Sequence, residues 1–141
     1  MARRLLPLVA ALITLVSACG KDSPTNPTPA VETRIIALSS PDMNFGIVDV
    51  GQSSDRELLV RNDGNAPLTT TGLTGPAGTE GVFIVSGANV TIQPGATRSI
   101  GIRFAPTEQR DYSGVFTVNG NQTAGSNTHT FSASGKRSGP L

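Results

Sequence analysis

The 141-residue sequence contains one cysteine, one histidine and no tryptophan. A single cysteine excludes an internal disulfide, and one cysteine with one histidine cannot supply the ligand set of a zinc site. Charged residues make up only 15% of the chain, and neither sign forms a run. Nucleic-acid binding usually requires a clustered basic face, so we expect no nucleic-acid partner.

Sequence patterns for catalysis are also missing. The chain has no Gly-x-Ser-x-Gly turn for a serine nucleophile and no glycine-rich phosphate loop. His129 is the sole histidine available as a base, and because it shares the inward parity of Phe131 we interpret it as a half-buried structural residue. The run Asn62-Asp63-Gly64-Asn65 lacks EF-hand spacing and is typical of a turn. We therefore predict no enzyme, no cofactor and no metal site.

No window of the sequence shows helical periodicity, and sixteen glycines and ten prolines argue against helices. Apolar and polar residues alternate instead, as in residues 57–62 (ELLVRN), which is typical of half-buried strands. We expect strands at residues 33–38, 43–50, 57–62, 67–73, 82–85, 89–92, 99–104, 112–118 and 128–133. Seven to nine short antiparallel strands in about 100 residues predict an all-β, immunoglobulin-like β-sandwich over residues 32–135.

Several short segments follow one another in a defined order. They are FGIVDVG at residues 45–51, LLVRNDGNAPL at 58–68, IQPG at 92–95, IRFAP at 102–106, YSG at 112–114 and FSASG at 131–135. Their order and spacing resemble the bacterial choice-of-anchor D modules, which are similar to ASH/HYDIN-like and MSP-like immunoglobulin-type domains. The resemblance implies a sandwich without shared catalytic residues. Tyr112 also occupies a position similar to the tyrosine corner of such sandwiches.

The first 18 residues have the order of a secretory signal peptide. Arg3 and Arg4 precede an apolar run from residue 5 to 15, and small residues end at Ala18. The run is shorter than the roughly 20 apolar residues that a transmembrane helix requires. The sequence LVSAC at residues 15–19 resembles a bacterial lipobox. That resemblance implies cleavage between Ala18 and Cys19 and attachment of diacylglycerol and an acyl chain such as palmitate to Cys19.

The segment after the predicted cleavage site differs in composition from the rest of the chain. Residues 19–31 carry three prolines and few large apolar side chains, so we expect a spacer that cannot bury a hydrophobic face. Residues 136–141 are expected to form a flexible tail. Gly20 takes the place where an aspartate tends to retain lipoproteins at the inner membrane, which favours the outer membrane.

One strand suggests a binding mode. Residues 125–135 contain neither a charged residue nor a proline, although natural edge strands usually carry such blocking residues. If this strand lies at a sheet edge, Thr128, Thr130 and Ser132 belong to a surface that would accept a partner strand by β-augmentation. The alternative is that the strand lies inside its sheet.

Together these patterns predict a lipid-anchored protein of the bacterial cell envelope with one non-catalytic module. Its expected partners are the membrane, through the lipid, and an unidentified envelope protein that it binds or scaffolds. Carbohydrate or cell-wall recognition is the alternative. Exposed aromatic residues would favour it, whereas the five phenylalanines and the tyrosine mostly fall at inward positions.

Overall fold

A computed structural model of the chain describes residues 28–39 and 42–139. Met1–Ala30 and Val31–Leu141 form separate units, and the fold described here belongs to the second of them. The predicted cleavage and lipidation positions, Ala18 and Cys19, lie outside the described residues.

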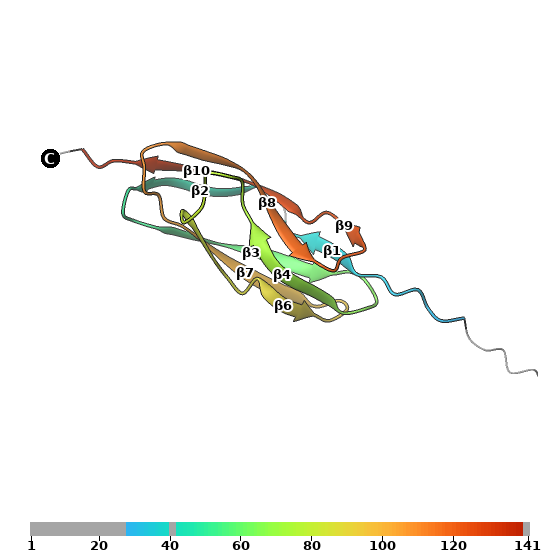
Figure 1. Ribbon diagram of the computed structural model, residues 1–141. Helices are drawn as coiled ribbons and strands as arrows, with labels where there is room; N and C mark the ends of the chain where they lie inside the picture. The colour runs from blue at the N-terminus through green and yellow to red at the C-terminus, as the bar shows by residue number, and fades with distance from the viewer. Residues whose placement is uncertain (1–27, 40–41, 140–141) are drawn as a thin grey trace, which may run out of the picture. The chain divides into compact units, whose positions relative to one another are not determined.

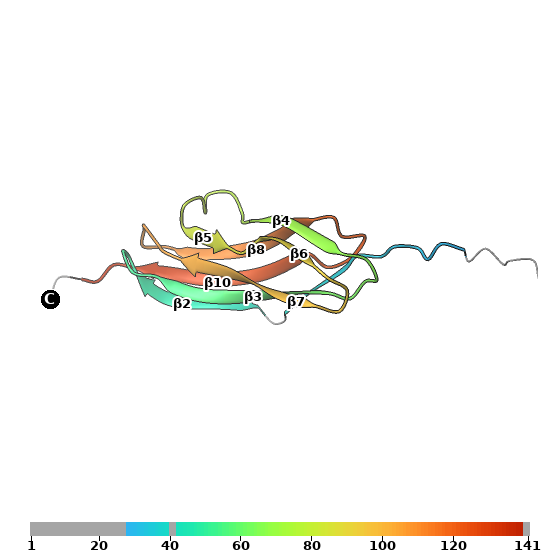
Figure 2. The same ribbon diagram turned by 90° about the horizontal axis from the view of Figure 1, so that it is seen from below.

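The second unit is a sandwich of two five-stranded sheets (Figures 1 and 2). Its strands are β1 (Ile35–Leu38), β2 (Met43–Asp49), β3 (Ser54–Asn62), β4 (Leu68–Thr74), β5 (Phe83–Ser86), β6 (Asn89–Ile92), β7 (Thr97–Phe104), β8 (Asp111–Gly120), β9 (Ala124–Gly125) and β10 (Thr128–Lys136). Sheet A has the order β5-β7-β3-β1-β9, and sheet B has the order β2-β10-β8-β4-β6. The predicted all-β, immunoglobulin-like sandwich is confirmed.

Each of the nine predicted strands overlaps a strand of the structure, but two features were not predicted. β9 is a two-residue strand without any alternating pattern. In addition, β1 pairs with β9 and β2 pairs with β10 in parallel, whereas the other strand pairs are antiparallel. β2 therefore runs in the same direction as β10, and the chain enters and leaves the sandwich at opposite ends (Figure 1).

The core forms where the alternating apolar side chains of both sheets meet. Its least exposed apolar members are Ile36, Leu58, Val60, Leu68, Ile92, Ile100, Ile102, Phe104, Phe116 and Val118. Part of this core is a cluster of aromatic rings, and Phe83 lies at the centre of that cluster. The Phe83 ring centre lies between 4.9 and 5.5 Å from those of Phe45, Phe104, Phe116 and Phe131. Tilted and edge-to-face arrangements of this kind add stability beyond burial alone.

The last strand of the chain corrects one sequence hypothesis. β10 lies between β2 and β8 in sheet B, so it is an interior strand. Ser132, for example, stands opposite Ser113 of β8 and Asn44 of β2. The hypothesis that β10 is an open edge strand is wrong, because β2 pairs in parallel with it from Phe131 to Lys136. Ser132 therefore has a strand on both sides, whereas Thr128 and Thr130 precede the residues that pair with β2. Within the described part of the chain, no helix is long and apolar enough to cross a membrane.

Candidate functional site

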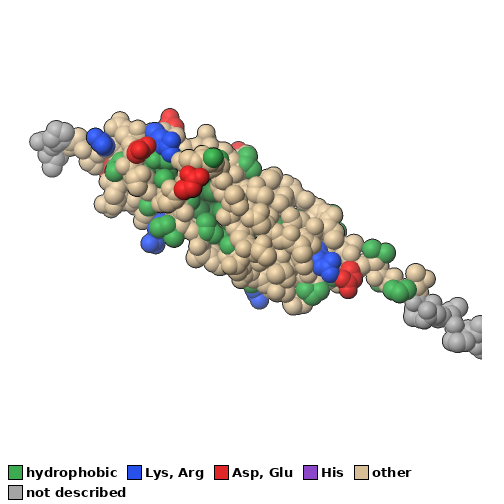
Figure 3. Space-filling view, in the orientation of Figure 1, with side chains coloured by type: hydrophobic (Ala, Val, Ile, Leu, Met, Phe, Trp, Pro, Cys, Tyr) green, Lys and Arg blue, Asp and Glu red, His purple; other side chains and the backbone are tan. Residues whose placement is uncertain are grey.

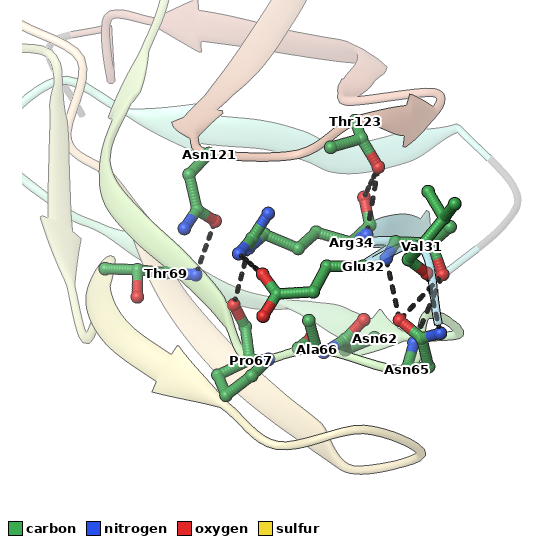
Figure 4. Close-up of polar contacts among 11 residues, drawn as sticks. Val31, Glu32, Arg34, Asn62, Asn65, Ala66, Pro67, Thr69, Asn121 and Thr123 are labelled. Carbon is green, nitrogen blue, oxygen red and sulfur yellow. Dashed lines mark hydrogen bonds and ion pairs between the residues drawn. The ribbon is translucent and has the colours of Figure 1, made fainter. Parts of the chain in front are cut away.

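The residues at the start of the sandwich are held by a group of polar contacts that we call the N-terminal clamp; several of these contacts are drawn in Figure 4. The clamp consists of residues 31–36 together with Gly64, Asn65, Thr123 and Gly125. The side chain of Asn65 is its centre. Its Oδ1 accepts a hydrogen bond from the Thr33 N–H at 2.7 Å, and its Nδ2 donates to the Val31 carbonyl at 3.0 Å. One amide side chain thus pairs with the extended backbone on both sides of Glu32.

Main-chain contacts strengthen the same side of the clamp. The N–H groups of Asn65 and Ala66 both donate to the Thr33 carbonyl at 3.0 Å. On the opposite side, the Thr123 hydroxyl accepts a hydrogen bond from the Arg34 N–H at 2.9 Å, and the Thr123 N–H donates to the Arg34 carbonyl at 2.8 Å. The entering segment is therefore fastened from the β3–β4 turn and from the β8–β9 loop at once.

Two glycines allow this close approach. A Cβ atom at Gly64 would collide with the Thr33 carbonyl, and one at Gly125 would collide with the Ile36 carbonyl. Gly125 also has a φ of 92°, which side-chain-bearing residues rarely adopt. Only glycine permits the neighbouring loops to lie this near the backbone of the entering segment.

Asn62, at the start of the adjoining turn, is fully buried and fully paired. Its Nδ2 donates to the carbonyls of Ala66 at 2.8 Å and Ile92 at 3.0 Å, and its Oδ1 accepts from the Gly64 N–H at 3.0 Å. These hydrogen bonds give the Asn62 side chain a structural role in holding the turn. The described residues hold no group of three or more acidic, histidine or cysteine side chains placed to bind a metal ion.

His129 is 8% exposed, and both of its ring nitrogens face main-chain oxygens. Nε2 lies 2.7 Å from the Ser39 carbonyl, and Nδ1 lies 2.8 Å from the Thr130 carbonyl. The ring therefore joins β10 to the end of β1. A cavity of about 470 Å³ lies beside it, lined by Ala37 and Leu38 as well as by polar residues such as Asp42 and Thr128. The contacts of the ring are those of a structural histidine.

The two sheets present different outer faces. Outward-facing side chains in the middle of sheet B are mainly threonine, serine and asparagine, and include Thr117, Thr128, Thr130 and Ser132. In Figure 3 the middle of the visible face carries few charged side chains, and the charged side chains lie toward both ends. This distribution is consistent with the polar, uncharged composition of the sheet. Thr128, Thr130 and Ser132 thus lie on a polar sheet face, next to strands on both sides at Ser132.

Sheet A instead carries charge on its outer face. The Arg103 guanidinium forms two hydrogen bonds with the Asp55 carboxylate, at 2.7 and 3.0 Å. This pairing holds the pKa of Asp55 below its usual value and raises the pKa of Arg103. Ile84 lies on the same face, opposite Arg103 in the ladder, and is 57% exposed.

Sequence reasoning missed the N-terminal clamp. The Asn-Asp-Gly-Asn run predicts a turn, but nothing in it indicates that Asn65 and Gly64 contact residues 31–35. In contrast, the tyrosine corner was predicted. The Tyr112 hydroxyl points to the Glu108 carbonyl at 3.5 Å, and the Arg110 guanidinium lies 4.4 Å from the ring centre.

Solved structures with a similar fold come from unrelated sources. The ASH/PapD-like domain 7 of human CEP192 matches with a TM-score of 0.62 and 14% identity, over 94% of this chain and 100% of that one. A Porphyromonas gingivalis protein of unknown function matches with a TM-score of 0.61 and 18% identity, over 79% of this chain and 51% of that one. The secreted serine protease VesC of Vibrio cholerae matches with a TM-score of 0.53 and 14% identity, over 76% of this chain.

The extent of these matches limits what they show. This chain spans about half of the Porphyromonas protein and 24% of VesC, and identities this low show the fold alone. No curated protein matches the sequence. The family match, however, covers residues 34–134, which include all of β1 to β9 and most of β10. The chain therefore belongs to the HYDIN/CFA65/VesB-like, Ig-like domain family.

Proposed function

We propose that this chain is a lipid-anchored protein of the bacterial cell envelope, and that its Ig-like domain is a non-catalytic module for protein binding or scaffolding. The sequence resemblance to choice-of-anchor D modules agrees with an anchored role. The observation that carries the proposal is the order of parts along the chain. A signal-like segment ends at Cys19, a proline-rich spacer follows, and the sandwich begins immediately after it.

Lipid at Cys19 would supply the anchor. One acyl chain holds a protein to a bilayer only marginally, whereas two or more give stable attachment. A diacylglycerol and an additional acyl chain would therefore hold the protein without a spanning helix. The spacer would place the sandwich up to about 30 Å from the lipid, at about 3.1 Å per residue of extended chain.

The N-terminal clamp supports a tethering role because it fastens the sandwich at the point where the spacer joins it. Asn65 and Thr123 bond the entering backbone from two different loops. A pull on the spacer is thereby shared between the β3–β4 turn and the β8–β9 loop before it reaches β1. The opposite end of the sandwich, away from the clamp, stays available for a partner.

Carbohydrate recognition is less well supported. Sugar-binding surfaces commonly offer an exposed aromatic ring, but Phe45, Phe104, Tyr112, Phe116 and Phe131 are buried, and Phe83 is half-buried among them. The hydroxyl-rich face of sheet B is the feature that would favour this second function. Protein binding therefore remains the first choice.

The anchor is tested by intact-mass measurement of the full-length gene product purified from bacterial membranes. The expected product begins at Cys19 and carries the added mass of diacylglycerol and an acyl chain. A Cys19→Ser variant should lack this lipid mass, while Ser17→Ala should retain it as a matched control. An unlipidated Cys19, or a wild-type product that keeps residues 1–18, would contradict the proposal.

A further inference from the structure

The outermost strands of the two sheets differ in how their free edges are treated. β2 is one outermost strand of sheet B, and its edge is blocked. The Asn44 carbonyl accepts a hydrogen bond from Arg56 Nε at 2.9 Å, and the Gly46 N–H donates to the Asn44 side chain at 2.7 Å. A register shift interrupts the strand at the same place, where Gly46 has a φ of 75°. Bulges and inserted charges of this kind prevent a second strand from pairing.

Two other outermost strands offer little to a partner. β9 is only two residues long. β6 has four residues, but its outward-facing side chains are the polar Asn89 and Thr91, and the Thr91 hydroxyl is already bonded to that of Thr69 at 3.2 Å. Neither strand presents apolar area that pairing would bury.

β5, the remaining outermost strand, has an open edge. The Ala105 N–H donates to the Val82 carbonyl at 2.8 Å, so Val82 faces β7. Because hydrogen-bonding direction alternates along an antiparallel strand, Ile84 also faces β7, whereas the N–H and C=O groups of Phe83 and Val85 point away from it. The strand contains no charge, proline or bulge within Phe83–Ser86.

The loop that precedes β5 is held by contacts on the sheet B side of the sandwich. The loop at residues 75–82, seen beside β5 in Figure 2, is held toward sheet B. Arg110 Nη2 donates to the Gly78 carbonyl at 2.5 Å, and Pro76 packs where a Cβ on Gly114 would stand. A cavity of about 260 Å³ lies between this loop and β5, lined in part by Phe83 and Val85.

The outer face of β5 suits a second copy of the same chain. Ile84 is uncharged and 57% exposed, so it would be desolvated favourably against an identical side chain. Its neighbour Arg103 is paired with Asp55 at 2.7 Å. Two copies brought together along β5 would therefore not set uncompensated guanidinium groups against each other.

We propose that two copies of this chain associate by antiparallel pairing of β5 with β5 across a twofold axis centred on Ile84. Phe83 of each copy then pairs with Val85 of the other, which satisfies both outward-facing N–H and C=O groups on each strand. The two Ile84 residues become a directly opposed pair without hydrogen bonds between them. The inference extends the proposed function by naming a partner, and it relies on that function only for the high local concentration that membrane anchoring would supply.

Disulfide trapping tests this geometry. Opposed residues in such a pair have Cα atoms about 4.5 Å apart, within the range that a disulfide spans. The full chain carrying Ile84→Cys is oxidised briefly in bacterial membranes and, after purification, in detergent at high protein concentration. Dimers are then scored by non-reducing electrophoresis. The parent chain, which has Cys19 alone, gives the background.

Ile47→Cys is the matched control. Ile47 is 73% exposed, more than Ile84, but it lies on the blocked strand β2. Pairing through β5 predicts at least about five-fold more dimer from Ile84→Cys than from Ile47→Cys, because only the former meets its copy in disulfide geometry. Equal yields would show random collision and overturn the proposal.

A second change separates pairing from folding. Val85→Pro removes an N–H that faces away from β7, so the ladder within sheet A stays intact. Added to Ile84→Cys, it should reduce the dimer to background while the circular dichroism spectrum stays that of a β-sandwich. In a fold-intact protein, undiminished dimer would overturn the proposal. Dimer in detergent with an unlipidated Cys19 would refute the anchor alone, and a lipidated monomer would refute the pairing alone.

Discussion

β2 and β5 are both outermost strands, and each exposes an isoleucine. Their backbones differ, because other groups occupy the free edge of β2, whereas no group among the described residues is bonded to that of β5. Around β2, the Arg56 side chain and the Asn44 amide occupy the free edge, and a bulge at Gly46 breaks its register. Around β5, Phe83 and Val85 direct their main-chain groups away from β7, without charge or bulge in the strand. Exposure of an apolar side chain therefore does not show whether the backbone edge of its strand is free to pair. The hydrogen bonds of the backbone polar groups show that.

The largest expected effect concerns Asn62, which ties the β3–β4 turn to the end of β6, the outermost strand of sheet B that follows β5 in the chain. Asn62→Ala leaves the Ala66 and Ile92 carbonyls and the Gly64 N–H without this partner. We expect a loss of about 2–4 kcal/mol in the free energy of unfolding, because buried groups lose their hydrogen bonds. Urea denaturation measures it, and the exposed Asp63→Ala serves as control. Equal losses for both variants would contradict the assignment.

The next effect tests the side of sheet A opposite β5, where β9 pairs with the first two residues of β1. Gly125→Ala would force a Cβ against the Ile36 carbonyl, at a φ of 92°. Gly51 has a similar φ of 88° but open space around it. Backbone strain costs about 1–3 kcal/mol at either site, and the collision should add to it only at Gly125. Thermal unfolding should therefore give a lower melting temperature for Gly125→Ala than for Gly51→Ala. Equal melting temperatures would contradict the collision assigned to Gly125.

A smaller effect would convert the closed edge toward an open one. Arg56→Ala removes the donor to the Asn44 carbonyl while leaving the strand sequence of β2 unchanged. In the Ile47→Cys background we expect the disulfide-linked dimer to increase above that of Ile47→Cys alone. If the yield does not change, the bulge at Gly46 is sufficient to block β2, and the contribution assigned to Arg56 is wrong.

The smallest effect concerns the charge pair beside β5. The hydrogen bonds from Arg103 lower the pKa of Asp55, so the carboxylate stabilises the folded state above its unfolded pKa, and this contribution is lost as pH falls through the folded pKa. Carboxyl carbon NMR should give a midpoint below that of a reference aspartate. Arg103→Gln should move the midpoint upward, and an unchanged midpoint would contradict the pairing.

The sequence predicted most of the sandwich because the core is made by alternating residues. Leu58, Val60, Ile100, Ile102 and Phe104 are buried as their periodicity indicates. Local alternation reports which face of a strand is apolar, and it reports this equally well for interior and outermost strands. The fold class therefore followed from pattern alone.

The position of a strand within its sheet did not follow from pattern. Lack of charge indicates an open edge only in an outermost strand; residues 125–135 lack charge, but β10 lies between β2 and β8. Long-range pairing decides that position. Likewise, Arg56 reaches Asn44, and Asn65 reaches Val31 and Thr33, across separations that no local motif records.

The difference between the open and closed edges is tested most directly by amide hydrogen exchange at β5 in the wild-type protein. The account predicts that the Phe83 and Val85 amides exchange rapidly in dilute solution and become protected as protein concentration rises. The Ile84 amide, which faces β7, should be protected throughout. Protection of Phe83 and Val85 at every concentration would show that the edge is already closed. Rapid exchange at every concentration would show that no second strand pairs with it.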